Sequence, residues 1–294
     1  MAEANAGELD LPSNWGRWGP DDQLGTLNFI TSAARARGAA EVRTGRVVSL
    51  AFPVTPVPLS GPIPFGTSGT PAAILQSINF TGTPPRALTD LLVINTHHVM
   101  LTHIDALAHI PLGDRVYPGV NINEATAGGT IKHGSTSVLV GGIATRGVLL
   151  DLAPGGQLPE GHAVTDSDLD NAELQMGVHV ESGDALVLRG GWAQRYGIQA
   201  AVPHLSLDAV RWIARREIAL YAGDIGDPPL TAGASMWMHG TALPRLGLPL
   251  IDNPDVSALA QTCAELGRDT FFFVLGALPV VGATGVPVNP LAIF

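Results

Sequence analysis

The sequence predicts a single domain of the mixed α/β class with a β-rich core. Short apolar runs of strand length recur along the 294 residues, and helical patterns lie between some of them. Apolar residues make up 46% of the chain and charged residues only 14%, a composition that supports a sizeable core and is unlike that of disordered chains. No repeat or break in composition marks a boundary. We therefore interpret residues 1–294 as one domain, with residues 1–30 as an N-terminal arm.

Four helices are expected from apolar periodicity and from capping residues. Thr31 and Ser32 precede the first helix, Ser206 precedes the third, and Gly267 ends the fourth. The second follows the capping sequence Asp-Ser-Asp at residues 166–168. The expected helices span residues 33–43, 169–176, 207–216 and 257–266.

The apolar runs of strand length predict the sheet. They span residues 47–54, 91–95, 137–140, 147–150, 185–188, 218–222 and 270–275. The stretch Thr55–Pro85 is crowded with Pro, Gly, Ser and Thr. A loop of that length is typical of a lid or a binding loop, and an insertion without a role is the alternative.

Charge and cysteine content argue against several classes of protein. The formal net charge is −10 and no basic cluster stands out, which disfavours nucleic acid and an anionic membrane surface as partners. Cys263 is the single cysteine, so neither an intrachain disulfide nor a cysteine-based zinc site can form. No secretory signal or membrane-spanning apolar run is recognisable, and we expect a cytoplasmic protein.

Four of the nine histidines fall between His97 and His109. If the chain is extended from residue 91 to residue 105, the side chains of His97, His103 and Asp105 share one face, and that of His98 points away. A buried aspartate needs a partner charge or a metal, and histidines on both sides of Asp105 favour the metal. Imidazole and carboxylate ligands suit Zn²⁺ or Mn²⁺.

The position of His109 depends on the conformation of the chain after Ala106. His109 lies four residues beyond Asp105, so it would face the same site if the chain becomes helical there.

The segment that includes Thr102–Ala106 and His109 resembles the signature H-x-G-T-H-x-D-[AS]-x-x-H of the cyclase / kynurenine formamidase-like metal hydrolases. Three further segments, residues 14–31, 183–192 and 283–293, resemble the start, a central strand and the closing segment of that family. The resemblance implies a single domain with the mixed, β-rich core of the kynurenine formamidase-like, swivelling β/β/α type.

The resemblance also implies a set of metal ligands, in which His103, Asp105 and His239 match family positions. Two features depart from the family pattern. The first histidine of the signature is replaced by Val99, and the distant glutamate by Asp252, which is one methylene shorter. His97 is the expected substitute for the missing histidine, and a bulge in the strand would favour His98 instead. The implied ligands are His103, Asp105, His239, His97 and Asp252.

The resemblance implies hydrolysis of a small amide, lactam, ester or lactone by a water that one or two Zn²⁺ or Mn²⁺ ions activate. His109 matches the position of the residue that accepts and donates the proton. An additional metal ligand, or a residue that supports the ligands from behind, is its alternative role. Trp15 and Trp18 are expected either to line the pocket for a hydrophobic or aromatic substrate, or to pack the N-terminal arm. We expect a homodimer or homotetramer.

Two other functions fit the same sequence. One is a natural-product cyclase or dehydratase that uses the same metal site. The other is a metal-poor relative that binds a ligand without turnover, which Val99, Asp252 and Leu101 (in place of the glycine of the signature) would favour.

Overall fold

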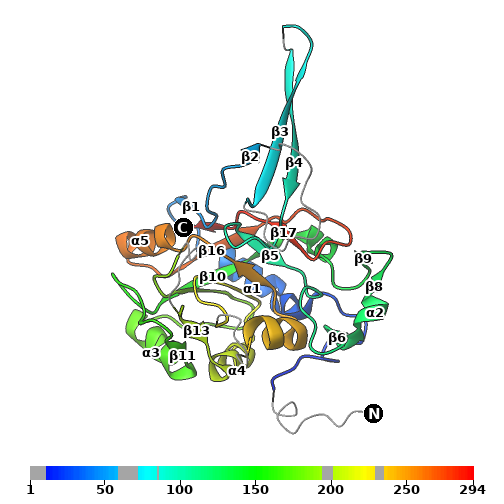
Figure 1. Ribbon diagram of the computed structural model, residues 1–294. Helices are drawn as coiled ribbons and strands as arrows, with labels where there is room; N and C mark the ends of the chain where they lie inside the picture. The colour runs from blue at the N-terminus through cyan, green and yellow to red at the C-terminus, as the bar shows by residue number, and fades with distance from the viewer. Residues whose placement is uncertain (1–10, 59–71, 85, 194–200, 229–234) are drawn as a thin grey trace.

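The computed structural model describes residues 11–58, 72–84, 86–193, 201–228 and 235–294. It confirms the mixed α/β class, because helices pack on a sheet of nine strands (Figure 1). In spatial order the strands are β1 (Val47–Ser49), β18 (Leu291–Ile293), β16 (Thr270–Leu275), β10 (Ile143–Asp151), β12 (Ala185–Arg189), β14 (Leu220–Gly223), β15 (Leu250–Asp252), β5 (His103–Asp105) and β17 (Gly285–Pro287). The strands β10, β12, β14 and β15 are parallel, and the other neighbours in this sheet are antiparallel.

The central strands are buried on both faces, which explains their nearly continuous apolar sequences. In β12, Leu186 and Leu188 join the hydrophobic cluster on one face, while Ala185 and Val187 join the cluster on the other. The sheet therefore holds a core on each side, and β5 lies near the end of the sheet beyond this parallel centre.

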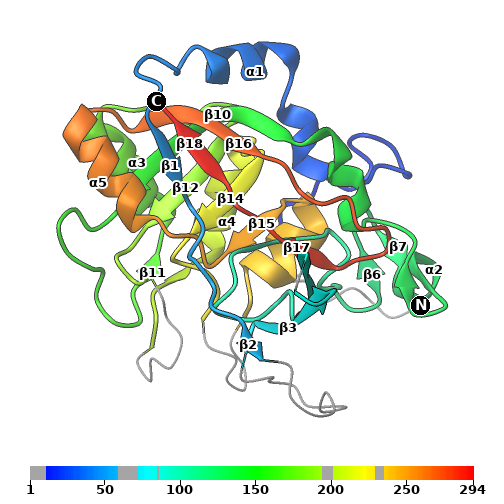
Figure 2. The same ribbon diagram turned by 90° about the horizontal axis from the view of Figure 1, so that it is seen from above.

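Helices cover both faces of the sheet. Apolar side chains of α3 (Asp166–Met176) and α4 (Leu207–Arg215) belong to the first cluster, and those of α5 (Ser257–Leu266) to the second. The first helix, α1 (Ser32–Ala39), runs alongside β10 (Figure 2). Short helices complete the fold: η1 (Gly25–Phe29), α2 (Ile122–Ala125), η2 (Thr136–Gly141) and the π-helical η3 (Met238–Leu246).

A two-stranded ribbon of β3 (Ile74–Thr81) and β4 (Ala87–Ile94) rises away from the rest of the molecule (Figure 1). The short strand β2 (Val57–Pro58) pairs with the base of β3. The described residues also form three small two-stranded sheets: β6 (Arg115–Val116) with β7 (Val120–Asn121), β8 (Thr126–Ala127) with β9 (Thr130–Ile131), and β11 (Ala163–Val164) with β13 (His204–Leu205).

The predicted helices agree with the structure better than the predicted strands do. The fourth helix has the predicted bounds, with Gly267 in the left-handed conformation after it. The side chains of Thr31 and Ser206 accept backbone hydrogen bonds at the starts of α1 and α4. The first helix is shorter than predicted and ends at Ala39. The second begins three residues earlier, because Thr165 rather than the Asp-Ser-Asp sequence forms a capping box with Asp168.

One strand prediction was wrong, and a second was too long. Residues 137–140 form part of the helix η2, where Val140 is exposed to solvent rather than paired in a sheet. The strand predicted over residues 47–54 ends at Ser49, before Pro53, a residue that cannot donate a ladder hydrogen bond. The extended conformation considered for residues 91–105 is not continuous, because β4 ends at Ile94 and residues 95–102 form turns before β5.

The long loop predicted over Thr55–Pro85 was partly wrong, because β2 and β3 lie within it. Residues 59–71 and 85 of that stretch fall outside the described residues. No helix within the described part of the chain is long and apolar enough to span a membrane.

Candidate metal centre

Strand β5 positions the first two side chains of the site. It is antiparallel to β15 on one side and to β17 on the other. The register places His103 opposite Asp252 of β15, and Asp105 opposite Gly285 of β17. Both β5 side chains are buried, with 3% of His103 and 1% of Asp105 exposed. Residues about 150 apart in sequence are thus brought to adjacent positions by strand pairing.

The Asp105 carboxylate is surrounded by three imidazole rings. Oδ1 lies 3.0 Å from His97 Nδ1 and 3.6 Å from His103 Nε2, and Oδ2 lies 3.3 Å from His239 Nε2. Neither oxygen accepts a hydrogen bond of good geometry, although both are buried. A buried carboxylate in that condition is costly unless a cation is close. The arrangement therefore fits a metal ion.

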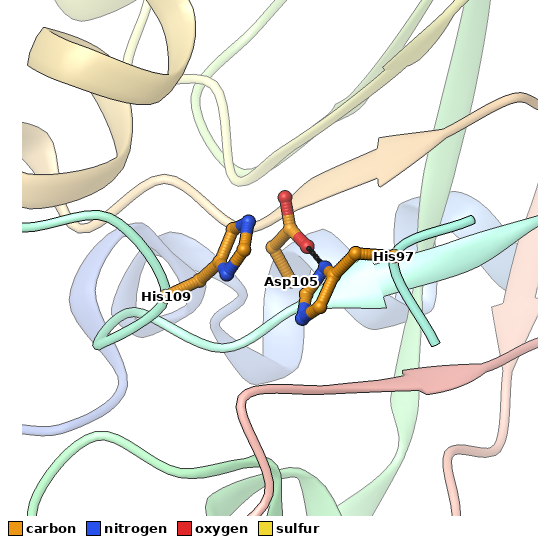
Figure 3. Close-up of side chains that lie close together, drawn as sticks. All are labelled: His97, Asp105 and His109. Carbon is orange, nitrogen blue, oxygen red and sulfur yellow. Dashed lines mark ion pairs between the residues drawn. The ribbon is translucent and has the colours of Figure 1, made fainter. Parts of the chain in front are cut away.

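His97 is held from two sides, in the turn between β4 and β5. Its ring stacks on that of His109, with centroids 3.7 Å apart and planes 5° from parallel (Figure 3). Its Nε2 lies 2.9 Å from Thr284 Oγ1. A Cβ atom on Gly285 would lie 2.8 Å from His97 Cε1, so the glycine makes room for the ring.

His103 is oriented by its own chain. Its Nδ1 donates to the carbonyl of Leu101 over 2.8 Å, so the ring proton is on Nδ1. The lone pair of Nε2, on the side of Asp105, is then available to bind a metal.

His239 lies in the first turn of η3, where Asp227 positions it through three hydrogen bonds. His239 Nδ1 and the backbone N–H of His239 both donate to Asp227 Oδ2, and Met238 N–H donates to Oδ1, each over 2.8 Å. The opposite nitrogen, Nε2, lies 3.3 Å from an oxygen of Asp105 and 3.3 Å from one of Asp252.

The charges in the cluster shift one another's pKa values. Burial alone would raise the pKa of Asp105, but the contacts with His239 and His97 outweigh it and hold that pKa well below its usual range. Burial alone would lower the pKa of His239, yet Asp105, Asp227 and Asp252 raise it to about 12. Burial lowers the pKa of His109 to about 4, against the opposing effect of Asp105. The pKa shifts of Asp105 and His239 therefore reflect how closely these groups face one another.

Among the described residues, two groups of donor atoms are close enough to hold an ion, and they share Asp105. One is His97, Asp105 and His109, and the other is His103, Asp105 and Asp252; within each group the donor atoms lie within 4.8 Å of one another. Nitrogen and carboxylate oxygen donors of this kind suit a divalent transition metal.

The structure brings together all six residues that the sequence singled out for the metal and for proton transfer: His97, His103, Asp105, His109, His239 and Asp252. The stated reason for preferring His97 to His98 was wrong, because the turns remove the strand parity on which it rested. His98 instead accepts a hydrogen bond from Met100 N–H through Nδ1. His109 reaches the cluster from a turn rather than from the helix considered after Ala106.

Trp15 and Trp18 pack the N-terminal segment onto the domain. Trp15 Nε1 donates to the carbonyl of Pro244 over 2.8 Å, and its ring lies against Gly119. Trp18 makes an edge-to-face contact with Phe29, with centroids 5.0 Å apart. A role for either ring in binding substrate stays a prediction.

Sequence reasoning assigned no role to Asp227, Thr284 or Gly285. Thr284 and Gly285 belong to a segment matched only as the family's closing sequence, and Asp227 lies twelve residues before His239. No spacing rule connects these residues to the histidines. The contacts of Thr284 and Gly285 with His97 depend on the pairing of β17 with β5, and those of Asp227 depend on the path of the chain between β14 and η3.

Comparison with known proteins agrees with the family resemblance seen in the sequence. A family model described as putative cyclase matches residues 30–228, which include His97, His103, Asp105 and His109 but end before His239 and Asp252. No curated protein sequence matches the chain.

Solved structures with the same fold include a protein described as a novel cyclase, which is 27% identical with a TM-score of 0.80 over 96% of this chain and 97% of that one. Isatin hydrolase A from Labrenzia aggregata, bound to benzyl benzoate, is 17% identical with a TM-score of 0.62 over 86% of this chain and 94% of its own. Isatin hydrolase A from Ralstonia solanacearum is 20% identical with a TM-score of 0.57 over 89% and 94% of the two chains.

Proposed function

Because the chain belongs to the putative cyclase family, we propose that it is a metal-dependent hydrolase that cleaves a C–N or C–O bond of a small amide, lactam, ester or lactone. The observation that carries the proposal is the buried Asp105 carboxylate, which has three histidine nitrogens around it and no hydrogen bond of good geometry. The likeness in fold to two isatin hydrolases supports a cyclic amide as one substrate class to test.

The donor set supports Zn²⁺ or Mn²⁺ as the ion, in one or two positions. A bound ion of this kind supplies Lewis acidity and lowers the pKa of water from about 15.7 towards about 7. The residues that would hold it are His103, Asp105, Asp252 and His239, with His97 on the side of His109.

His109 is the residue proposed to accept and return the proton. Its ring stacks on His97, which in turn lies 3.0 Å from Asp105, so His109 is at the edge of the donor cluster (Figure 3). A group in that place can take a proton from the attacking water and deliver it to the leaving nitrogen or oxygen, a contribution that is typically about 10²–10⁴-fold in rate.

The proposal is tested by metal analysis together with a substrate panel. The protein, purified without chelator, is analysed for Zn and Mn by mass spectrometry and assayed with isatin-like lactams, N-formyl aromatic amines and aryl lactones. We expect at least one equivalent of metal and hydrolysis of a member of the panel, both abolished in His103→Ala. His179→Ala removes a surface histidine and is the matched control.

Three outcomes would contradict the proposal. A protein that holds no metal, and gains no activity on addition of Zn²⁺ or Mn²⁺, would favour a ligand-binding relative without turnover. Ring closure or loss of water, with no hydrolysis, would favour the cyclase or dehydratase. Full activity in His103→Ala would place the chemistry elsewhere.

A further inference from the structure

The ribbon of β3 and β4 is amphipathic. Cross-strand partners share a face, so the pairing Ile74↔Ile94, Gln76↔Leu92, Ile78↔Asp90 and Phe80↔Leu88 places these eight residues on one side. Six of the eight are apolar. We call this side the apolar ribbon face and define it by Ile74, Ile78, Phe80, Leu88, Leu92 and Ile94.

The opposite side of the ribbon is mixed: in its inner half Leu75 pairs with Val93 and Ser77 with Leu91, and only its outer half is mainly polar. There Asn79 pairs with Thr89, and Thr81 pairs with Ala87. Alternation of this kind is typical of a sheet that packs one face on other apolar residues.

The apolar ribbon face lies open in the single chain. Phe80 and Leu88, which are cross-strand partners, are each 65% exposed, and Ile78 is 52% exposed. A two-stranded ribbon is marginally stable in water unless its apolar face is covered. The ribbon also points away from the domain, so its outer half does not pack on the domain's own core (Figure 1).

We propose that the apolar ribbon face is an interface at which a second copy of this chain packs. A ribbon with one apolar face is complementary to itself, because a two-fold axis brings the same residues of two copies together and covers both faces at once.

The size of the exposed surface agrees with such a contact. The five large side chains, Ile78, Phe80, Leu88, Leu92 and Ile94, are between 40% and 65% exposed. Together they present on the order of 500 Å² per copy, so a pair would bury about 1,000 Å², the size at which specific interfaces begin.

The charge on the ribbon also suits a second copy. The chain carries a formal charge of −10, yet residues 72–94 contain only Arg86 and Asp90 as charged residues. Asp90 accepts a hydrogen bond from Gln76 on the same face, over 2.7 Å. The two copies would therefore meet at a neutral surface rather than at their acidic ones.

The test compares two variants that add the same charge to opposite sides of the ribbon. Phe80→Asp with Leu88→Asp changes a cross-strand pair on the apolar ribbon face. Asn79→Asp with Thr89→Asp changes the neighbouring pair on the other face and is the matched control. Masses in solution are measured by light scattering after size exclusion, with thermal melts to show that both variants fold.

We expect the wild type and the control to have at least twice the 30.5 kDa mass of one chain, and the apolar-face variant to have a smaller assembly, a monomer if this is the only interface. A wild type that stays monomeric at about 100 µM overturns the proposal, and the face would then belong to a different partner. An unchanged assembly in the apolar-face variant overturns it too. Neither result depends on metal content, so the proposed hydrolase function is tested separately.

Discussion

The Nδ1 atom of His239 donates to Asp227 over 2.8 Å, and this contact turns the opposite ring nitrogen towards Asp105 and Asp252. Metal-binding histidines are generally fixed in this way by a carboxylate or carbonyl behind the ring, which sets the tautomer and raises the basicity of the ligating nitrogen. Asp227 also holds the backbone at the start of η3, so one side chain fixes both the ring and the segment that carries it.

Replacement of Asp227 is therefore expected to weaken metal binding. Asp227→Asn removes the anionic acceptor of His239 Nδ1 but keeps the size of the side chain. We expect metal affinity to fall roughly 10–100-fold, measured by competition with a chelator of known affinity. Asp166→Asn, at the start of α3, is the control and should bind like the wild type. Equal affinities in all three proteins would show that Asp227 has a structural role only.

The space beside His97 gives a steric prediction. Gly285→Ala would place a Cβ atom 2.8 Å from His97 Cε1, closer than non-bonded carbon atoms approach, so the ring must move. We expect activity to fall on the order of 10²-fold, the typical cost of a misplacement of about 1 Å, while the fold is retained by circular dichroism.

Gly276→Ala is the matched control for that substitution, because nothing lies within 4 Å of a Cβ atom there and no left-handed backbone is required. If the two glycine variants hydrolyse substrate equally well, His97 does not need its present position.

Removal of the metal is expected to lower thermal stability. An ion that binds only the folded state stabilises it by about 2.7 kcal/mol when its concentration is 100 times its Kd. Treatment with chelator should therefore lower Tm, and addition of Zn²⁺ or Mn²⁺ should restore it. In His103→Ala the shift should disappear; a shift of unchanged size in that variant would mean that the ion binds at another place.

Cys263 provides a prediction about pH. Burial raises the pKa of its thiol to about 12, whereas a free thiol has a pKa of about 8.5. Because the thiolate is the reactive form, the native protein should react slowly with a thiol reagent even at about pH 9, and the protein in denaturant should react at once. Fast stoichiometric reaction in the native state would contradict the buried position of Cys263.

Local signals in the sequence predicted the helices well. Ser206 and Gly267 mark helix ends through hydrogen bonds and backbone conformations that involve only neighbouring residues. The ribbon could not be predicted in the same way, because β3 interrupts its apolar residues with Gln76, Ser77 and Asn79 and lies in a stretch rich in turn-forming residues.

The candidate site was predictable to different degrees. His103 and Asp105 lie two residues apart in one strand, so local alternation was enough to place them together. His239 and Asp252 were identified only through the family resemblance, because strand order in the sheet determines their distance from Asp105. Asp227 and Gly285 were missed, since a hydrogen bond behind a ring and an absent side chain leave no pattern in the sequence.

The pairing of β5 with β17 has a consequence for the order of events during synthesis. Thr284 and Gly285, which position His97, lie 187 and 188 residues after it, so they leave the ribosome much later than His97 does. A nascent chain therefore contains the candidate metal ligands before it contains the two residues that position His97. We expect high-affinity metal uptake to follow the synthesis of β17 and its pairing with β5, so that loading with metal marks the closure of this edge of the sheet.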